Sequence, residues 1–298
     1  MTGPVEQPTG AATGGLAVVE PPTASPPRRV GPPPARRPAQ GARAVLEEIA
    51  AILLMALRAA RLGVVPPFTW KDEFVEQTFL IIRRCLFPVI LATTFLGLGV
   101  PGIQGGNLTA IFGTVDRLGA LFVMASVREF APWITGMVVA GVGGTAICAD
   151  LGARKVRQEL DALAVLGMDP VREIVVPRFL ALGLVTALMN LIAIVFGIIG
   201  GWIAVVLVFT DTSAGYLATF SSNFTLPDLL GSVLKTSLFG FIIAAVCCYK
   251  GMTVKGGAEG VGRAVNQAVV MSFVGIWAFN FVFTTTLLAA FPETGNLH

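Results

Sequence analysis

Long apolar windows with very few charged residues are the feature that most constrains how this chain can fold. Each window is about as long as, or longer than, the roughly 20 residues with which an α-helix crosses the ~30 Å hydrocarbon core of a bilayer. They predict an all-α integral membrane protein with about five transmembrane helices. The windows lie at about residues 85–103, 118–149, 179–210, 229–249 and 264–291.

The composition agrees with a protein whose main solvent is lipid. Of the 298 residues, 54% are hydrophobic and only 13% are charged, and the mean hydropathy is +0.77. Soluble domains carry about a quarter charged residues. The formal net charge of +3 gives no support to a nucleic-acid partner.

Two regions precede the first window. Residues 1–43 are rich in Pro, Ala and Arg and hold few bulky apolar side chains, so we expect a disordered cytoplasmic tail. Residues 44–84 begin with apolar side chains at helical spacing and favour an amphipathic helical region in the membrane interface. An ordinary surface helix packed on protein is the alternative. Residues 85–298 are then the transmembrane domain.

Lysine and arginine predict the orientation. Basic residues are frequent before the first window, between the second and third, and between the fourth and fifth, whereas the other two connectors carry almost none. Positive charge is enriched on the cytoplasmic side of membrane proteins. We therefore expect the N-terminus in the cytoplasm and the C-terminus outside.

The motifs of enzymes are missing from the sequence. The only histidine is His298, which is a poor candidate for the base of a serine hydrolase, and no Gly-x-x-x-x-Gly-Lys-Ser/Thr loop occurs. The cysteines have no zinc-like spacing with a histidine and are expected to be small buried apolar residues. We predict no catalytic residue, no metal site and no cofactor in this chain, so that any role driven by ATP requires a partner.

Arg128 and Glu129 interrupt the second window. Charged side chains at membrane depth cost several kcal/mol and generally face a protein interior or a water-filled cavity. The pair could line a substrate cavity, or it could be a structural ion pair or lie nearer the interface. The residues alone favour neither interpretation.

A short amphipathic helix is predicted near residues 157–168, between the second and third windows. Leu160, Leu163, Ala164 and Gly167 share one of its faces, and Gly167 and Pro170 end it. An isolated helix this short is marginal in water, so it is expected to dock either on a cytoplasmic partner or on its own membrane domain.

Several stretches resemble the MlaE/YrbE permease family. Residues 140–154 (AGVGGTAICADLGAR) carry the likeness, which continues through residues 159–163, 167–170 and 176–178. Residues 260–270 (GVGRAVNQAVV) carry it again at the start of the fifth window. The resemblance covers residues 68–290 and points to the A-type YrbE subunit of an actinobacterial Mce system.

The resemblance implies the permease subunit of an ATP-driven lipid transporter. Its expected partners are a second YrbE-type permease chain, a cytoplasmic ABC ATPase that binds ATP and Mg, and MCE-domain proteins on the outer side of the inner membrane. Arg128 and Glu129 would lie at the lipid cavity. The residues that would couple the chain to the ATPase are Glu159, Asp161, Leu163, Leu166 and Gly167.

The expected cargo is a hydrophobic lipid such as a fatty acid or a sterol, moved inward across the cell envelope. The alternative function is a membrane scaffold that anchors envelope proteins without transport. One departure from the family is Val142, where many relatives have arginine.

Overall fold

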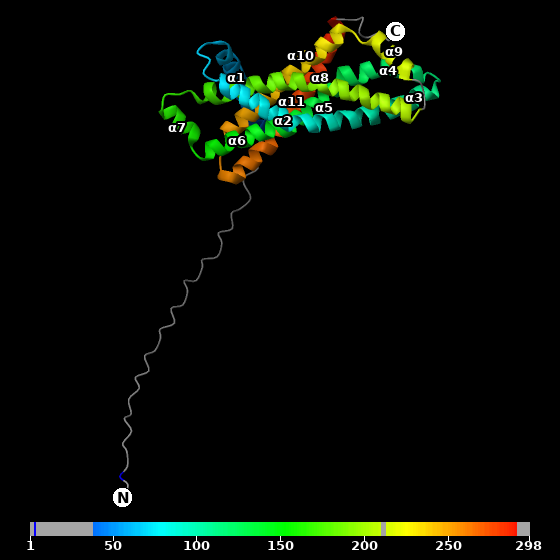
Figure 1. The fold of residues 1–298 in the computed structure, drawn as a ribbon. Coiled ribbons are helices and arrows are strands. Elements are labelled where there is room, and N and C mark those ends of the chain that lie inside the picture. Colours follow the sequence, from blue (N-terminus) through cyan, green and yellow to red (C-terminus); the bar gives the residue numbers. More distant parts are fainter. Residues whose placement is uncertain (1–2, 4–37, 210–212, 291–298) are drawn as a thin grey trace. The chain divides into compact units, whose positions relative to one another are not determined.

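The computed structural model describes residue 3 and residues 38–209 and 213–290. Every regular element in these ranges is helical, which confirms the all-α prediction. The described residues from 44 onward cluster as one compact unit, and most of the predicted disordered tail lies outside the described residues. The fold of residues 44–290 is drawn in Figure 1.

Helices of three kinds make up the chain. The α-helices are joined by short 3₁₀ and π-helical segments, labelled η. In chain order the elements are α1 (Pro38–Val64), α2 (Lys71–Gly97), η1 (Leu98–Gln104), α3 (Gly105–Ile111), η2 (Val115–Arg117), α4 (Leu118–Phe122), η3 (Val123–Phe130), α5 (Ala131–Val138), η4 (Val139–Gly144), α6 (Thr145–Val156), α7 (Glu159–Val165), η5 (Val171–Val175), α8 (Val176–Leu207), α9 (Ser213–Asn223), α10 (Leu226–Met252) and α11 (Gly257–Ala290).

Five continuous helical stretches within the described residues are long and apolar enough to cross a membrane, as predicted. Each stretch begins at or before the start of its apolar window, and the first, second and fourth also end beyond it. The stretches are Lys71–Ile111, Leu118–Val156, Val171–Leu207, Leu226–Met252 and Gly257–Ala290.

The start of the first stretch differs from the expected division at residue 85. Helix α2 begins at Lys71 and continues without a break past that position. Asp72 and Glu73 lie in its first turn, where acidic side chains interact favourably with the helix dipole. The region 44–84 thus contributes both α1 and the first half of a membrane-crossing helix.

Close packing of α8 against α2 forms the centre of the unit. A Cβ atom added at Gly200 would lie 2.4 Å from the Thr94 carbonyl oxygen, and one at Gly97 would lie 2.6 Å from the Gly197 carbonyl oxygen. Such distances are possible only for glycine, and small residues let the backbones of membrane helices approach closely. Helix α8 is uninterrupted from Val176 to Leu207, and its Gly197 and Gly200 serve this packing.

The turns between helices gather at two ends of the unit. At one end, Arg58 of α1 forms an ion pair with Asp169 at 2.8 Å, and Glu48 of α1 pairs with Lys250 of α10. Helix α7 lies at this end, whereas α3 and α9 lie at the other (Figure 1). The loops predicted to face the cytoplasm therefore share one end.

Candidate functional site

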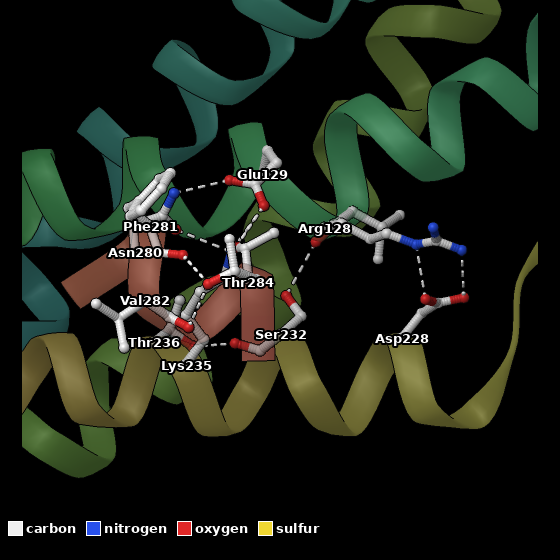
Figure 2. Close-up of polar contacts among 12 residues, drawn as sticks. Arg128, Glu129, Asp228, Ser232, Lys235, Thr236, Asn280, Phe281, Val282 and Thr284 are labelled. Atoms are coloured by element: carbon white, nitrogen blue, oxygen red, sulfur yellow. Dashed lines mark hydrogen bonds and ion pairs between the residues drawn. The ribbon is translucent and has the colours of Figure 1, made fainter. Parts of the chain in front are cut away.

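Arg128 and Glu129 lie on η3, a π-helical segment within the second membrane-crossing stretch. Segments of π-helix are rare and frequently occur at functional sites. The two residues do not pair with each other. Figure 2 shows that Arg128 is directed toward Asp228, whereas Glu129 is directed toward Asn280 and Thr284.

Arg128 forms an ion pair with Asp228 in the first turn of α10. Its Nε donates to Asp228 Oδ1 at 2.7 Å and its second guanidinium nitrogen donates to Oδ2 at 3.4 Å. The Asp228 side chain is fully buried. A charge-assisted contact of this fork-like kind is among the stronger polar interactions in proteins.

Asp228 is held in place by the local sequence. Thr225 is the N-cap of α10, and its Oγ1 donates to Asp228 Oδ2 at 2.7 Å while its backbone N–H donates to the same oxygen at 3.2 Å. Pro227 lies in the first turn, where its missing N–H costs nothing. This Thr-x-x-Asp capping box is a recognisable signal for a helix start, and it was missed in the sequence.

Glu129 connects three membrane-crossing stretches. Lys235 of α10 donates to its Oε1 at 3.1 Å, and Thr284 of α11 donates to the same oxygen at 2.8 Å. Asn280 of α11 donates to its Oε2 at 2.9 Å. Lys235 also donates to Asn280 Oδ1 and to Thr284 Oγ1 (Figure 2).

We call these six residues the polar network: Arg128, Glu129, Asp228, Lys235, Asn280 and Thr284. The network contains two buried or half-buried ion pairs, Arg128 with Asp228 and Glu129 with Lys235. Their partners come from positions 100 to 155 residues away, and no spacing in the sequence identifies them.

Arg128 and Glu129 also border a cavity. A cavity of about 170 Å³ is bordered by Arg128, Glu129, Asp228 and Lys235 on its polar side and by apolar residues, including Met124 and Leu287, on its other side. Ligand pockets for small molecules have volumes of roughly 300–1,000 Å³. This cavity can therefore hold only part of a lipid, with its polar group near the network.

A second cavity meets the first at Glu129. It measures about 240 Å³ and is lined by Trp133, Trp277 and Asn280 as well. The two tryptophan rings pack edge to face with centroids 4.9 Å apart. Glu129 thus borders two small hollows, one between η3, α10 and α11 and the other between η3, α5 and α11.

Helix α7 contains most of the residues expected to couple the chain to an ATPase. Glu159 forms an ion pair with Arg157 at 2.6 Å, and Asp161 forms one with Lys155 at 2.8 Å. The hydrogen bond from Arg157 to Glu159 raises the pKa of the Arg157 guanidinium, and the carboxylate charge adds to this effect. Gly167 has a φ of +78°, which ends the helix.

The apolar side chains of this region face two ways. Leu160 is buried and Leu163 packs partly against the core of the membrane domain. Val165 and Leu166 are 88% and 73% exposed. Of the two leucines expected to couple the chain to an ATPase, Leu166 is exposed and Leu163 is partly buried.

The cysteine and acidic side chains form no metal site or disulfide in the part of the chain that the structure describes. Cys85, Cys148, Cys247 and Cys248 are all buried and outside disulfides. No cluster of three histidine, cysteine or acidic residues that could hold a metal ion occurs there. Cys247 instead packs against the backbone at Gly144, where an added Cβ would lie 2.8 Å from its sulfur.

Comparison with known proteins decides the family. Residues 74–286 match the family described as Permease MlaE. The chain belongs to the MlaE permease family. It is 33% identical to a probable ABC transporter permease protein of Rickettsia typhi over 214 residues, which cover 70% of this chain and 83% of the relative.

Two further relatives extend the likeness. The chloroplastic protein TRIGALACTOSYLDIACYLGLYCEROL 1 of Arabidopsis thaliana is 33% identical over 72% of this chain and 61% of its own. The intermembrane phospholipid transport system permease protein MlaE of Haemophilus influenzae is 25% identical over a region that covers 72% of this chain and 83% of the relative. The chain is thus a multi-pass membrane subunit, an ABC transporter permease of the MlaE family.

Proposed function

We propose that this chain is the permease subunit of an ATP-driven, Mce- or Mla-like lipid transporter in the cell inner membrane. Its cargo is a hydrophobic lipid, such as a fatty acid or a sterol, and the direction is import. The partners are a second YrbE-type permease, an ABC ATPase that binds ATP and Mg, and MCE-domain proteins outside. The N-terminus is cytoplasmic and the C-terminus is on the outer side.

The family match over residues 74–286 is the observation that carries this proposal. The name of the Haemophilus influenzae relative refers to intermembrane phospholipid transport, which supports a lipid as cargo. The actinobacterial, A-type assignment rests on the resemblance of residues 148–152 (CADLG) and 248–251 (CYKG) to that branch of the family.

The polar network supports a role in lipid handling. It places charges at membrane depth, which is costly and is typical of a functional position. It also ties the second, fourth and fifth stretches together through Glu129. Because the adjoining cavity is smaller than a lipid, a second permease chain is needed to complete the binding space.

Helix α7 supports the coupling role. It lies between the second and third membrane-crossing stretches and exposes Val165 and Leu166 to its surroundings. An ATPase bound there would push on α7, and Leu160 and Leu163 would pass the movement to the membrane helices against which they pack.

The test combines purification with transport. The tagged chain is isolated from its native membrane in mild detergent, and its companions are identified by mass spectrometry. We expect a second permease, an ABC ATPase and MCE-domain proteins. The variant Glu129→Gln should keep these companions but lose uptake of a radiolabelled fatty acid or sterol.

The matched control is Glu76→Gln, which removes a carboxylate from α2 outside the network. It should transport normally. If the ATPase is absent, or if Glu129→Gln transports as well as the wild type, the scaffold interpretation replaces transport.

A further inference from the structure

A cavity between α1, α10 and α11 lies at the same end of the unit as α7. It measures about 250 Å³ and is lined by residues that include Glu48, Lys250, Lys255, Arg263 and Gln267. No residue of the polar network borders it. It is therefore a separate site.

Positive charge dominates the lining of this cavity. Lys250, Lys255 and Arg263 border it against the single carboxylate of Glu48, which leaves two positive charges in excess. Glu259 contacts Arg263 at 3.3 Å but is 83% exposed, and an ion pair in water contributes little. The cavity is electrostatically suited to an anion.

Lys250 forms the base of the cavity. Its side chain is only 9% exposed, and its ammonium group donates to Glu48 Oε1 and, at 3.0 Å, to Gln267 Oε1. An ammonium group has three N–H donors, so one remains for a ligand. The Lys255 side chain has no hydrogen bond or ion pair to any residue that the structure describes.

The turn that carries Lys255 is tightly built. An added Cβ at Gly260 would lie 2.0 Å from the Lys255 carbonyl oxygen, so the turn rests directly on α11. Gly256 has a φ of +92°, and a Cβ there would lie 3.2 Å from an Arg263 guanidinium nitrogen. The backbone thus holds Lys255 and Arg263 at the rim before any ligand arrives, which reduces the ordering cost of binding.

Helix α1 places the cavity near the lipid surface. Its exposed face carries large apolar side chains, among them Leu46, Leu53 and Leu57, as expected for a helix in the membrane interface. Glu48 lies on the same helix. Basic pockets between membrane helices on the cytoplasmic side are suited to phosphate-bearing headgroups.

We propose that the cavity lined by Lys250, Lys255 and Arg263 binds a phosphate-bearing anion, either the headgroup of an anionic phospholipid or free phosphate. The ligand's phosphate oxygens accept hydrogen bonds from Lys255 and Arg263 at the rim and from the remaining N–H of Lys250 at the base. Lys250 would contact both Glu48 and the ligand. Binding of the ligand in the cavity is therefore linked to the contact between α1 and α10. The site does not depend on lipid transport through the polar network.

The test uses the full chain, purified in detergent and stripped of lipid, with native mass spectrometry as the readout. Short-chain phosphatidylglycerol, short-chain phosphatidylcholine and potassium phosphate are titrated separately. The variant Lys255→Gln/Arg263→Gln should bind phosphatidylglycerol at least about tenfold more weakly than the wild type. The charge-preserving variant Lys255→Arg/Arg263→Lys should bind as the wild type does.

The control variant Arg61→Gln/Arg83→Gln removes the same number of positive charges away from the cavity and should keep the affinity. Binding of phosphatidylglycerol that potassium phosphate does not displace identifies a lipid headgroup; binding of phosphate that displaces the lipid identifies free phosphate. Either result supports the site. Equal losses in the cavity and control variants would overturn it, as would a wild-type protein that binds no phosphate and binds phosphatidylglycerol and phosphatidylcholine with equal affinity.

Discussion

At the scale of single residues, Asp228 has two structural roles. It caps the start of α10 through Thr225, and it is the counterion of Arg128 on η3. Removing one member of a buried ion pair costs roughly 3–5 kcal/mol, because the other charge is left without compensation. This residue should therefore matter more to stability than any acidic residue on the surface.

We expect Asp228→Asn to lower the free energy of unfolding of the detergent-solubilised chain by about 3 kcal/mol, and therefore to lower its melting temperature clearly. Asp72→Asn, at the exposed start of α2, should cost at most about 1 kcal/mol. The measurement is thermal unfolding followed by circular dichroism. Equal melting temperatures for the two variants would refute the assigned ion pair.

A double variant separates stability from function in the same pair. Replacing a buried ion pair by apolar residues of similar size is often neutral or stabilising. Arg128→Met/Asp228→Leu should therefore have a higher melting temperature than Asp228→Asn. We expect neither variant to support lipid uptake. Recovery of uptake would show that the pair only holds the helices together.

The sequence was informative about some residues of the site and silent about others. Arg128 and Glu129 stood out because charge is rare in an apolar window. Asp228 lay in a connector, and Asn280 and Thr284 are polar residues of ordinary appearance in the fifth window. Their importance depends on which helices pack together, and that arrangement is set by the whole structure.

At the scale of elements, α7 has one side on the membrane domain and another that is exposed. Leu163 packs against the core and Leu166 does not. The sequence predicted a short helix here, but helical spacing alone could not tell which leucine would find a partner within the chain.

Leu163→Asp and Leu166→Asp should consequently have different effects. Leu163→Asp should lower the melting temperature, since it introduces a charge where a side chain is packed. Leu166→Asp should leave the melting temperature unchanged and reduce the ATPase recovered on affinity purification at least severalfold. If ATPase recovery is normal with Leu166→Asp, α7 does not dock through this side chain.

The contact between α2 and α8 gives a second prediction at this scale. Gly200→Ala should destabilise the chain by about 1–3 kcal/mol, because the new methyl group would meet the Thr94 carbonyl oxygen at 2.4 Å. Gly99→Ala is the control, since no atom lies within 4 Å of a Cβ at that position. In thermal unfolding measured in detergent, Gly99→Ala should have a higher melting temperature than Gly200→Ala.

At the scale of the whole molecule, the number of membrane-crossing stretches followed from the sequence. Hydropathy and length determine this number, and both are local properties. The π-helical segments η1, η3, η4 and η5 were not predicted, because they depend on how neighbouring helices pack.

Orientation can be tested with cysteines, because the four native thiols are all buried. In the predicted topology, Leu166→Cys should react with an impermeant maleimide only after the membrane is opened. Ser221→Cys on α9 should react in intact cells or right-side-out vesicles. The reverse pattern would invert the topology, and labelling of both from one side would contradict an odd number of crossings between α7 and α9.

The polar network also has an electrical consequence. Its two cationic side chains, Arg128 and Lys235, are balanced by the carboxylates of Asp228 and Glu129. Carrying one elementary charge through 100 mV involves about 2.3 kcal/mol of work, but a group without net charge does none when it shifts as a unit. A movement that carries these four residues as one unit would therefore generate no gating current from the network.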